Sequence, residues 1–170
     1  MNVDFFVQQI AMNKKSMESY LRNKVMKNEY VAYEEKIAKC ETIIKNTSVI
    51  KDEATGIEIY KRNTPACNLF FNLTLIDLYT NIEIDFSKNM LKDYNELERH
   101  GYIDLLLSYI PKPEYVAWQK LIDMIASDYM ENNRSLVSYL DTKLTAIDRT
   151  ADSFSKVLTS LVDENDAPIG

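Results

Sequence analysis

The stretch TPACNLFFNLTLIDLYTNIEI, residues 64–84, decides the fold that this sequence predicts. Thr64 and Pro65 are typical of a helix start, because a hydroxyl caps free amide groups and proline fits the first helical turn. From Ala66 to about Ile84, apolar residues fall on most faces of a helix instead of forming one stripe. A helix that is apolar all round has to be buried. We therefore predict a central helix here, with other helices packed around it.

Most other segments carry apolar residues three and four positions apart, which is the spacing of a helix that packs along one face. A seam from Met26 to Ile44 is clear on the N-terminal side, so residues 4–46 are expected to form one helix or two. Asp85 is expected to cap a further helix that Gly101 terminates. The remaining helices are predicted at residues 4–27, 102–110, 113–132 and about 135–161.

The last of these helices has the most regular pattern in the chain, a coiled-coil-like seam without a fault. Its apolar positions are Val137, Leu140, Leu144, Ile147, Ala151, Phe154, Leu158 and Leu161. A seam of this length has to be covered, because exposed it would cause aggregation. Two alternatives stay open at this point. The seam packs against the Met26–Ile44 seam of the same chain, or it packs against a second copy or another protein.

Residues 48–62 differ from the rest of the chain. Ile57 and Ile59 alternate with Glu58 and Tyr60, and Gly56 suits a turn, so this segment predicts a small β-hairpin. In the whole chain, 3 Gly and 4 Pro are too few for the turns of a β-sandwich. The prediction is an all-α fold: a bundle of about six helices with long N- and C-terminal helices packed together, plus the hairpin. The expected domains are a single helical domain, residues 1–162, and a flexible acidic tail, residues 163–170.

Charge is unevenly distributed along the chain, and this distribution limits which kinds of molecule the protein is expected to bind. The net charge of −6 divides into +2 for residues 1–63 and −8 for residues 64–170. An acidic surface argues against nucleic acid or an anionic membrane as the partner of the C-terminal part. The most apolar stretch, Leu69–Tyr79, is too short to span a bilayer. No secretory signal is apparent after Met1, so a cytoplasmic location is expected.

Metal, cofactor and nucleotide chemistry find little support. The single histidine, His100, is too few for the usual zinc and di-iron sites, and an ion pair with Glu96 is its expected role. No glycine-rich loop is present. Cys40 lies on an apolar seam and is expected to be a buried thiol. Cys67 lies in the first turn of the central helix, which could lower its pKa, although no base is near it in sequence. We predict no catalytic, metal or cofactor residue.

Several polar residues on or near the central helix need partners. Asp77 is surrounded by apolar residues, and its expected partner is Arg99, Arg134 or an amide group at a helix end. Asn68, Asn72 and Asn81 predict a polar strip that forms hydrogen bonds between helices. In the N-terminal part, the basic side chains of Lys14, Lys15, Arg22 and Lys24 are expected to form a solvated surface, and binding of a nucleic-acid backbone is the alternative.

Three stretches carry a resemblance to known proteins. They are Leu75–Asn81, Ile110–Tyr115 and the run from Asp128 to Leu136. In these, the chain resembles small helical proteins carried by phages and mobile elements of low-GC Gram-positive bacteria, over roughly residues 64–145. The resemblance brings no assigned active site. It implies an accessory or structural part of a phage or element, or a binder of a host protein.

The sequence thus predicts a non-enzymatic protein-interaction or assembly protein, whose partner is another protein or a second copy of itself. One alternative is an acidic inhibitor of a host or competing nucleic-acid enzyme. A second is a carboxylate–metal enzyme that uses Asp77 and Asp85. The candidate interaction residues are Val137, Leu140, Leu144, Ile147, Phe154, Leu158, Asp123, Asp128 and Glu131.

Overall fold

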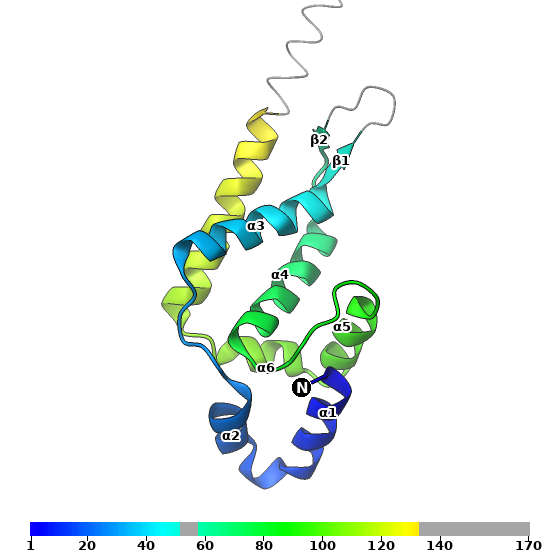
Figure 1. Ribbon diagram of the computed structural model, residues 1–170, viewed down its shortest axis with the longest axis vertical. Coiled ribbons are helices and arrows are strands. Elements are labelled where there is room, and N and C mark those ends of the chain that lie inside the picture. The colour runs from blue at the N-terminus through cyan, green and yellow to red at the C-terminus, as the bar shows by residue number, and fades with distance from the viewer. Residues whose placement is uncertain (52–57, 133–170) are drawn as a thin grey trace, which may run out of the picture. The chain divides into compact units, whose positions relative to one another are not determined.

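The chain is mostly helical and contains a small antiparallel sheet of two strands, as a computed structural model shows (Figure 1). The structure describes residues 1–51 and 58–132. The chain divides into two compact units, Met1–Ser127 and Asp128–Gly170. The all-α prediction is confirmed at this level. The predicted last helix, with all its seam residues, and the predicted tail lie outside the described residues, and the single domain stays a prediction.

The first unit contains helical segments and the two strands. In chain order they are α1 (Val3–Met12), a 3-10 turn η1 (Lys14–Ser16), α2 (Met17–Tyr20), a π-helical turn η2 (Leu21–Val25), α3 (Tyr33–Ser48), β1 (Val49–Lys51), β2 (Glu58–Tyr60), α4 (Thr64–Tyr79), α5 (Met90–Arg99) and α6 (Tyr102–Ser108). Helical residues 112–127 complete this unit, and residues 128–132 are helical in the second. The predicted hairpin is confirmed, because β1 pairs antiparallel with β2 and Ile50 lies opposite Ile59.

The central helix α4 lies where the sequence predicts it, but it ends at Tyr79 instead of near Ile84. Asn63 caps its start by accepting a hydrogen bond from the backbone N–H of Ala66. After Tyr79 the chain is extended, and Thr80 forms an antiparallel bridge with Met26. The backbone N–H of Asn81 donates to the carbonyl of Val25 at 2.7 Å. This pairing with the N-terminal part satisfies backbone groups that a longer helix would have bonded internally.

The same pairing explains why the predicted seam from Met26 is wrong in its first part. Helix α3 begins only at Tyr33, and Tyr33 itself is 55% exposed. The residues before it cannot be helical while they pair with the end of α4. The buried stripe of α3 begins instead at Lys36 and continues through Cys40 and Ile44. The expected long N-terminal helix is therefore divided into shorter pieces.

The helix after α4 also starts later than expected, because Asp85 has another role. Its carboxylate accepts hydrogen bonds from the backbone N–H groups of Ser87 at 3.0 Å and Lys88 at 3.2 Å, and so closes a turn. Helix α5 begins after that turn, at Met90. Gly101 ends this region as predicted, since its φ of 68° is the left-handed conformation that glycine adopts without strain.

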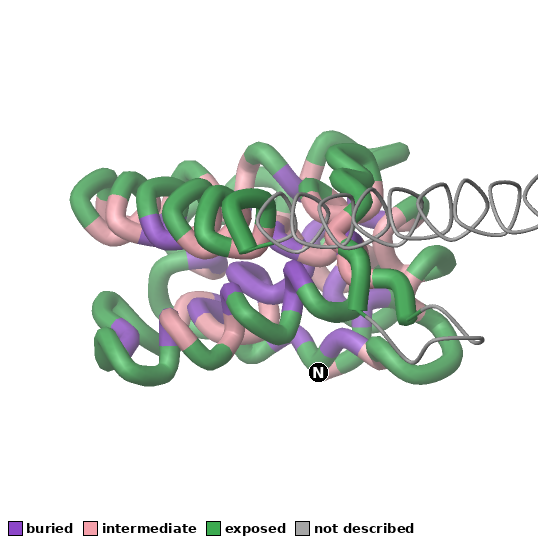
Figure 2. The backbone as a smooth tube through the Cα atoms, turned by 90° about the horizontal axis from the view of Figure 1, so that it is seen from above, coloured by how far each residue is buried: buried purple, intermediate pink, exposed green. Residues whose placement is uncertain are grey.

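Two hydrophobic cores lie on opposite faces of α4. The first core brings α1, η2, α5 and α6 onto the face that carries Leu73 and Ile76. The second core brings α3 and the helix at residues 112–127 onto the face that carries Leu75 and Tyr79. Figure 2 shows the buried segments gathered on the inner sides of the helices. A helix that packs on both sides has to be apolar all round, which is the pattern that the sequence shows.

Candidate functional site

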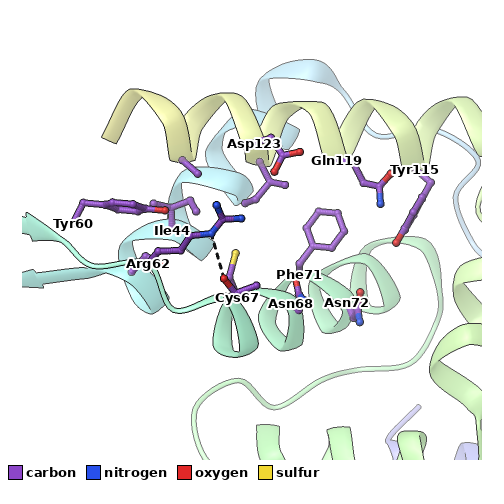
Figure 3. A pocket seen from close by; sticks show the side chains of 14 residues that line it. Ile44, Tyr60, Arg62, Cys67, Asn68, Phe71, Asn72, Tyr115, Gln119 and Asp123 are labelled. Carbon is purple, nitrogen blue, oxygen red and sulfur yellow. Dashed lines mark hydrogen bonds between the residues drawn. The ribbon is translucent and has the colours of Figure 1, made fainter. Parts of the chain in front are cut away.

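A cleft of about 500 Å³ opens at the edge of the second core (Figure 3). Its walls come from the end of α3, strand β2, the first half of α4 and helical residues 112–127. Apolar side chains form part of the lining, among them Ile44, Phe71 and Ile122. The volume lies within the roughly 300–1,000 Å³ that is common for small-molecule sites in proteins.

Two opposite charges face this cleft from different walls. Arg62 lies in the segment before α4, and Asp123 lies on the helix at residues 112–127; Figure 3 shows both side chains in the cleft. The Nε of Arg62 donates to the hydroxyl of Thr64 at 3.2 Å. Within the described residues, neither Arg62 nor Asp123 forms an ion pair. The cleft therefore offers one cation and one anion that are both available to a ligand.

Side-chain amides add neutral hydrogen-bonding groups. Asn68 and Asn72 lie on α4, one turn apart, and Gln119 lies on the opposite wall (Figure 3). The predicted strip of hydrogen bonds between helices is wrong, because Asn81 lies after the end of α4; its side chain donates to the carbonyl of Lys24 in η2 at 3.2 Å. Asn68 and Asn72 form no such bond among the described residues. Their amide groups face the cleft instead.

The thiol of Cys67 lies in the same cleft, and the expectation of a lowered pKa is wrong. Burial raises the pKa of this thiol. A hydrogen bond with Thr47 and the charge of Arg62 act in the opposite direction, and Asp123 adds to the increase. The sum is a raised pKa, because partial burial outweighs the hydrogen bond with Thr47 and the charge of Arg62. Cys40, buried as predicted, has its pKa raised to about 12 by burial. A nucleophilic thiolate is therefore disfavoured at both positions.

A buried polar network fixes the helix that forms one wall of the cleft. Glu114 receives a hydrogen bond from the hydroxyl of Tyr79 at 2.6 Å and lies 2.8 Å from the ammonium group of Lys36. The indole N–H of Trp118 donates to the oxygen of Tyr79 at 2.9 Å. The backbone N–H of Val31 also donates to Glu114, at 3.3 Å. The network thus joins α3, α4 and the chain before α3 to the helix at residues 112–127.

The network shifts the pKa values of its members in opposite directions. Burial favours the neutral form of Glu114, but the hydrogen bonds from Lys36, Tyr79 and Val31 outweigh it and lower its pKa. Burial and the hydrogen bond to Glu114 raise the pKa of Tyr79. Glu114 is therefore an anion, Tyr79 is a neutral donor, and Lys36 is the matching cation. The ring of Tyr30 lies against Lys36, with its centroid 4.8 Å from the ammonium nitrogen.

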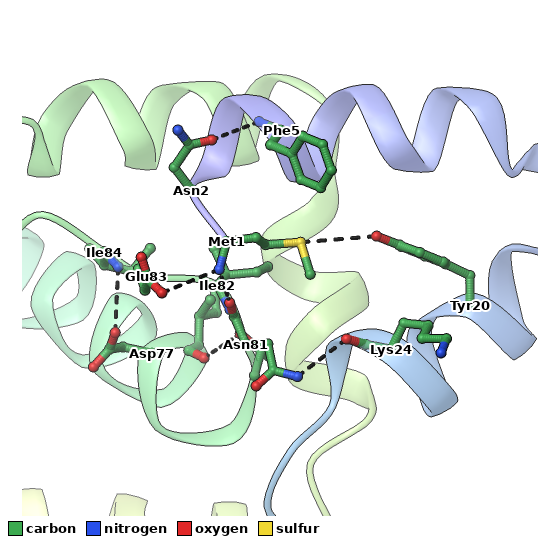
Figure 4. Close-up of polar contacts among 12 residues, drawn as sticks. Met1, Asn2, Phe5, Tyr20, Lys24, Asp77, Asn81, Ile82, Glu83 and Ile84 are labelled. Atoms are coloured by element: carbon green, nitrogen blue, oxygen red, sulfur yellow. Dashed lines mark hydrogen bonds and ion pairs between the residues drawn. The ribbon is translucent and has the colours of Figure 1, made fainter.

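The other candidate residues lie outside the cleft. Asp128 and Glu131 are exposed and form no ion pair among the described residues. Asp77 is half-buried, and Figure 4 shows its carboxylate next to the backbone N–H of Ile84, which donates at 3.4 Å. The partner of Asp77 is thus an amide group, as one of the expected alternatives had it, although this amide lies in the extended chain after α4. Arg99, another expected partner, pairs with Glu96 at 2.6 Å.

Two further expectations from the sequence can be compared with the structure. His100 lies 3.3 Å from Glu96, so the predicted ion pair is confirmed in position. In the basic surface, Arg22 lies 3.4 Å from Glu18 and over the ring of Tyr109. Asp85 closes a turn and Asp77 binds an amide. Within residues 1–51 and 58–132, no three histidine, cysteine or acidic residues are grouped so that they could hold a metal ion.

Comparison with known proteins identifies no relative of this chain. The chain matches no family model, no curated protein and no solved structure. In the part of the chain that the structure describes, no helix has both the length and the apolar character needed to cross a membrane.

Proposed function

We propose that this chain is a non-enzymatic protein-interaction or assembly protein that acts through the surfaces of its helices. The observation that carries the proposal is the outward face of helical residues 112–127. Val116 and Met124 are 36% and 60% exposed there. Asp123 on the same helix is exposed and has no cation paired with it among the described residues. Apolar side chains beside free charges suit an interface in which apolar contact binds and charge selects the partner.

The proposed partner is a second copy of the chain. The support is the sequence of the C-terminal seam, where apolar residues recur at coiled-coil spacing; they are Val137, Leu140, Leu144, Ile147, Phe154 and Leu158. Packing of this seam against the N-terminal helices of the same chain is the alternative. The resemblance to phage and mobile-element proteins supports an assembly role within such an element.

Light scattering of the full chain and of two matched variants tests self-association. Leu144→Asp places a charge in the predicted seam, and Thr142→Asp places the same charge two residues away, on the other side of the helix that the sequence predicts. We expect an oligomer for the wild type and for Thr142→Asp, and a monomer for Leu144→Asp. A monomeric wild type at its highest soluble concentration would contradict the proposal.

An acidic inhibitor of a nucleic-acid enzyme is a second candidate, favoured by the exposed carboxylates of Asp123, Asp128 and Glu131, which form no ion pair within residues 1–51 and 58–132. Such carboxylates suit a basic surface that otherwise binds phosphates. Alanine at all three positions separates the candidates. Loss of binding to a partner with intact self-association supports the inhibitor. Elemental analysis tests the remaining candidate, a carboxylate–metal enzyme, which requires a stoichiometric metal.

A further inference from the structure

We propose that the cleft between α4 and helical residues 112–127 binds a small zwitterion of the amino-acid type. The ligand would carry an anionic group, a cationic group and an apolar body. This inference does not depend on self-association: Asp123 is shared with the proposed interaction face, but Arg62 and the amides of the cleft are not, and the tests measure binding of small molecules.

The charges of the cleft carry the argument. Arg62 is bonded only to the hydroxyl of Thr64 among the described residues, so most of its guanidinium donors are available. Guanidinium groups bind carboxylates through two parallel hydrogen bonds. Asp123 offers acceptor oxygens for an ammonium group, and both charges act on the thiol of Cys67, so they lie around one part of the cleft.

The sum of these two charges is zero, which separates the possible ligands. A ligand with a single charge would pair with either Arg62 or Asp123, and the other of these two side chains would then face the apolar body of the ligand. A zwitterion satisfies both, and charge complementarity of this kind gives specificity. Inorganic phosphate or a simple cation is disfavoured for the same reason.

The rest of the lining suits the body of such a ligand. Phe71 and Ile122 provide apolar contact, and the side-chain amides of Asn68, Asn72 and Gln119 can donate or accept. A few polar groups around an apolar floor are typical of small-molecule sites. The buried network at Glu114 holds one wall in place, so the site is preorganised.

The rival reading is that Arg62 and Asp123 rotate and pair directly with each other. Both residues are exposed, and exposed ion pairs contribute little stability. A zwitterion would replace such a pair with two bonds of the same kind while adding apolar contact. Direct pairing would instead leave the cleft without affinity for any of the probes below.

The test follows side-chain amide signals of Asn68, Asn72 and Gln119 by NMR in the full chain labelled with ¹⁵N. The probes are L-phenylalanine, its N-acetyl derivative, which lacks the cation, and its amide, which lacks the anion. We expect saturable shifts with phenylalanine and about tenfold weaker binding of each derivative, which is the loss expected for one charge-assisted contact.

Two variants should each remove one part of the preference for phenylalanine over its derivatives. In Arg62→Gln, phenylalanine and its amide should bind equally well, whereas in Asp123→Asn, phenylalanine and its N-acetyl derivative should. The controls remove the same charges outside the cleft, at Lys61→Gln and Asp104→Asn, and should keep the wild-type preference. Equal binding of all three probes to the wild type overturns the proposal. The proposal is also overturned if phenylalanine, leucine and a dipeptide of the two cause no shifts of the amide signals at millimolar concentration.

Discussion

The two cores share one helix and differ in what they bury. On one side of α4, Leu73 and Ile76 contact apolar side chains of α1, η2, α5 and α6. On the other side, the second core contains Tyr79 and Trp118, whose polar atoms reach Glu114. Lys36, the one charged residue that is buried within the described residues, belongs to that side. The first core buries apolar side chains only, and the polar bonds that join its elements, such as Asn81 with Val25 and Lys92 with Asp4, lie outside that apolar cluster, whereas the second core also buries directed side-chain bonds.

This difference has a consequence for the candidate site. Apolar side chains attract without direction, so they tolerate small shifts of one helix along another. Hydrogen bonds and ion pairs at 2.6–2.9 Å hold only in one register. The cleft lies at the second core, where Glu114 holds the helix that carries Gln119 and Asp123. A site that needs charges at fixed positions is better supported by a wall with directed bonds.

The largest effect is expected in the first core. Leu73 is fully buried, and Leu73→Ala should lower the free energy of unfolding by about 3–4 kcal/mol, because it removes apolar contacts and leaves a cavity. Urea denaturation measures this loss. Leu91→Ala is the matched control, since Leu91 is 61% exposed, and it should change stability by less than about 0.5 kcal/mol. Equal losses in the two variants would show that the first core is not where the structure has it.

A smaller loss is expected when the network of the second core is broken. Glu114→Ala leaves the ammonium group of Lys36 buried without its partner, and removal of one member of a fully buried pair costs about 3–5 kcal/mol. The side chain of Glu114 is 13% exposed, so we expect about 2–3 kcal/mol here.

The double variant Lys36→Met/Glu114→Leu checks the cause of that loss. It should regain most of the stability, because no unpaired charge remains. If the double variant is as unstable as Glu114→Ala, the loss comes from packing and the comparison between the two cores fails.

The contrast between the cores also explains what the sequence could predict. The pattern of residues 64–84 and the three-and-four spacing at residues 113–129 report burial, and burial follows from side-chain type. The partners of Lys36 do not follow from any local pattern. Lys36 lies beside Ile37 of the predicted seam and nothing in the sequence marks it as buried, and its partner Glu114 is 78 positions away. Arg62 and Asp123 likewise line one cleft only because the hairpin and two helices converge there.

The helix ends were the other limit of prediction. The apolar pattern continues past Tyr79 through Ile82 and Ile84, which are both buried, although the chain there is extended. Burial alone cannot separate a helix from an extended segment when the run is short. The backbone pairing of Asn81 with Val25 decides the conformation, and it joins segments 56 positions apart.

Removal of the hydroxyl group of Tyr79 perturbs the second core less than removal of Glu114. Tyr79→Phe keeps the ring in the second core and removes one oxygen, so the indole N–H of Trp118 and one position of Glu114 lose their partner. A lost buried hydrogen bond costs about 1–2 kcal/mol, and we expect a decrease of that size in the free energy of unfolding. Phe71→Tyr adds a hydroxyl beside the cleft instead, and serves as a control for the presence of an additional polar atom. An unchanged stability of Tyr79→Phe would exclude the network as a source of stability.

The smallest effect should be the part of the pH dependence of stability that comes from Glu114 in the second core. The pKa of Glu114 is lower in the folded chain than its ordinary value of 4.5. The stabilisation from its charge is therefore fully present above pH 4.5 and is lost as the pH falls through the lower, folded-state value. Protonation keeps the side chain in place and retains part of its hydrogen bonding, so the loss should be smaller than in Glu114→Ala.

Urea midpoints of the wild type, Glu114→Gln and Leu73→Ala between about pH 6 and pH 3 measure this loss of stability. Leu73→Ala should keep the acid-side slope of the wild type, and Glu114→Gln should have a shallower one. Parallel curves for all three proteins would mean that the ion pair contributes nothing, and that the two cores differ in composition but not in the forces that hold them.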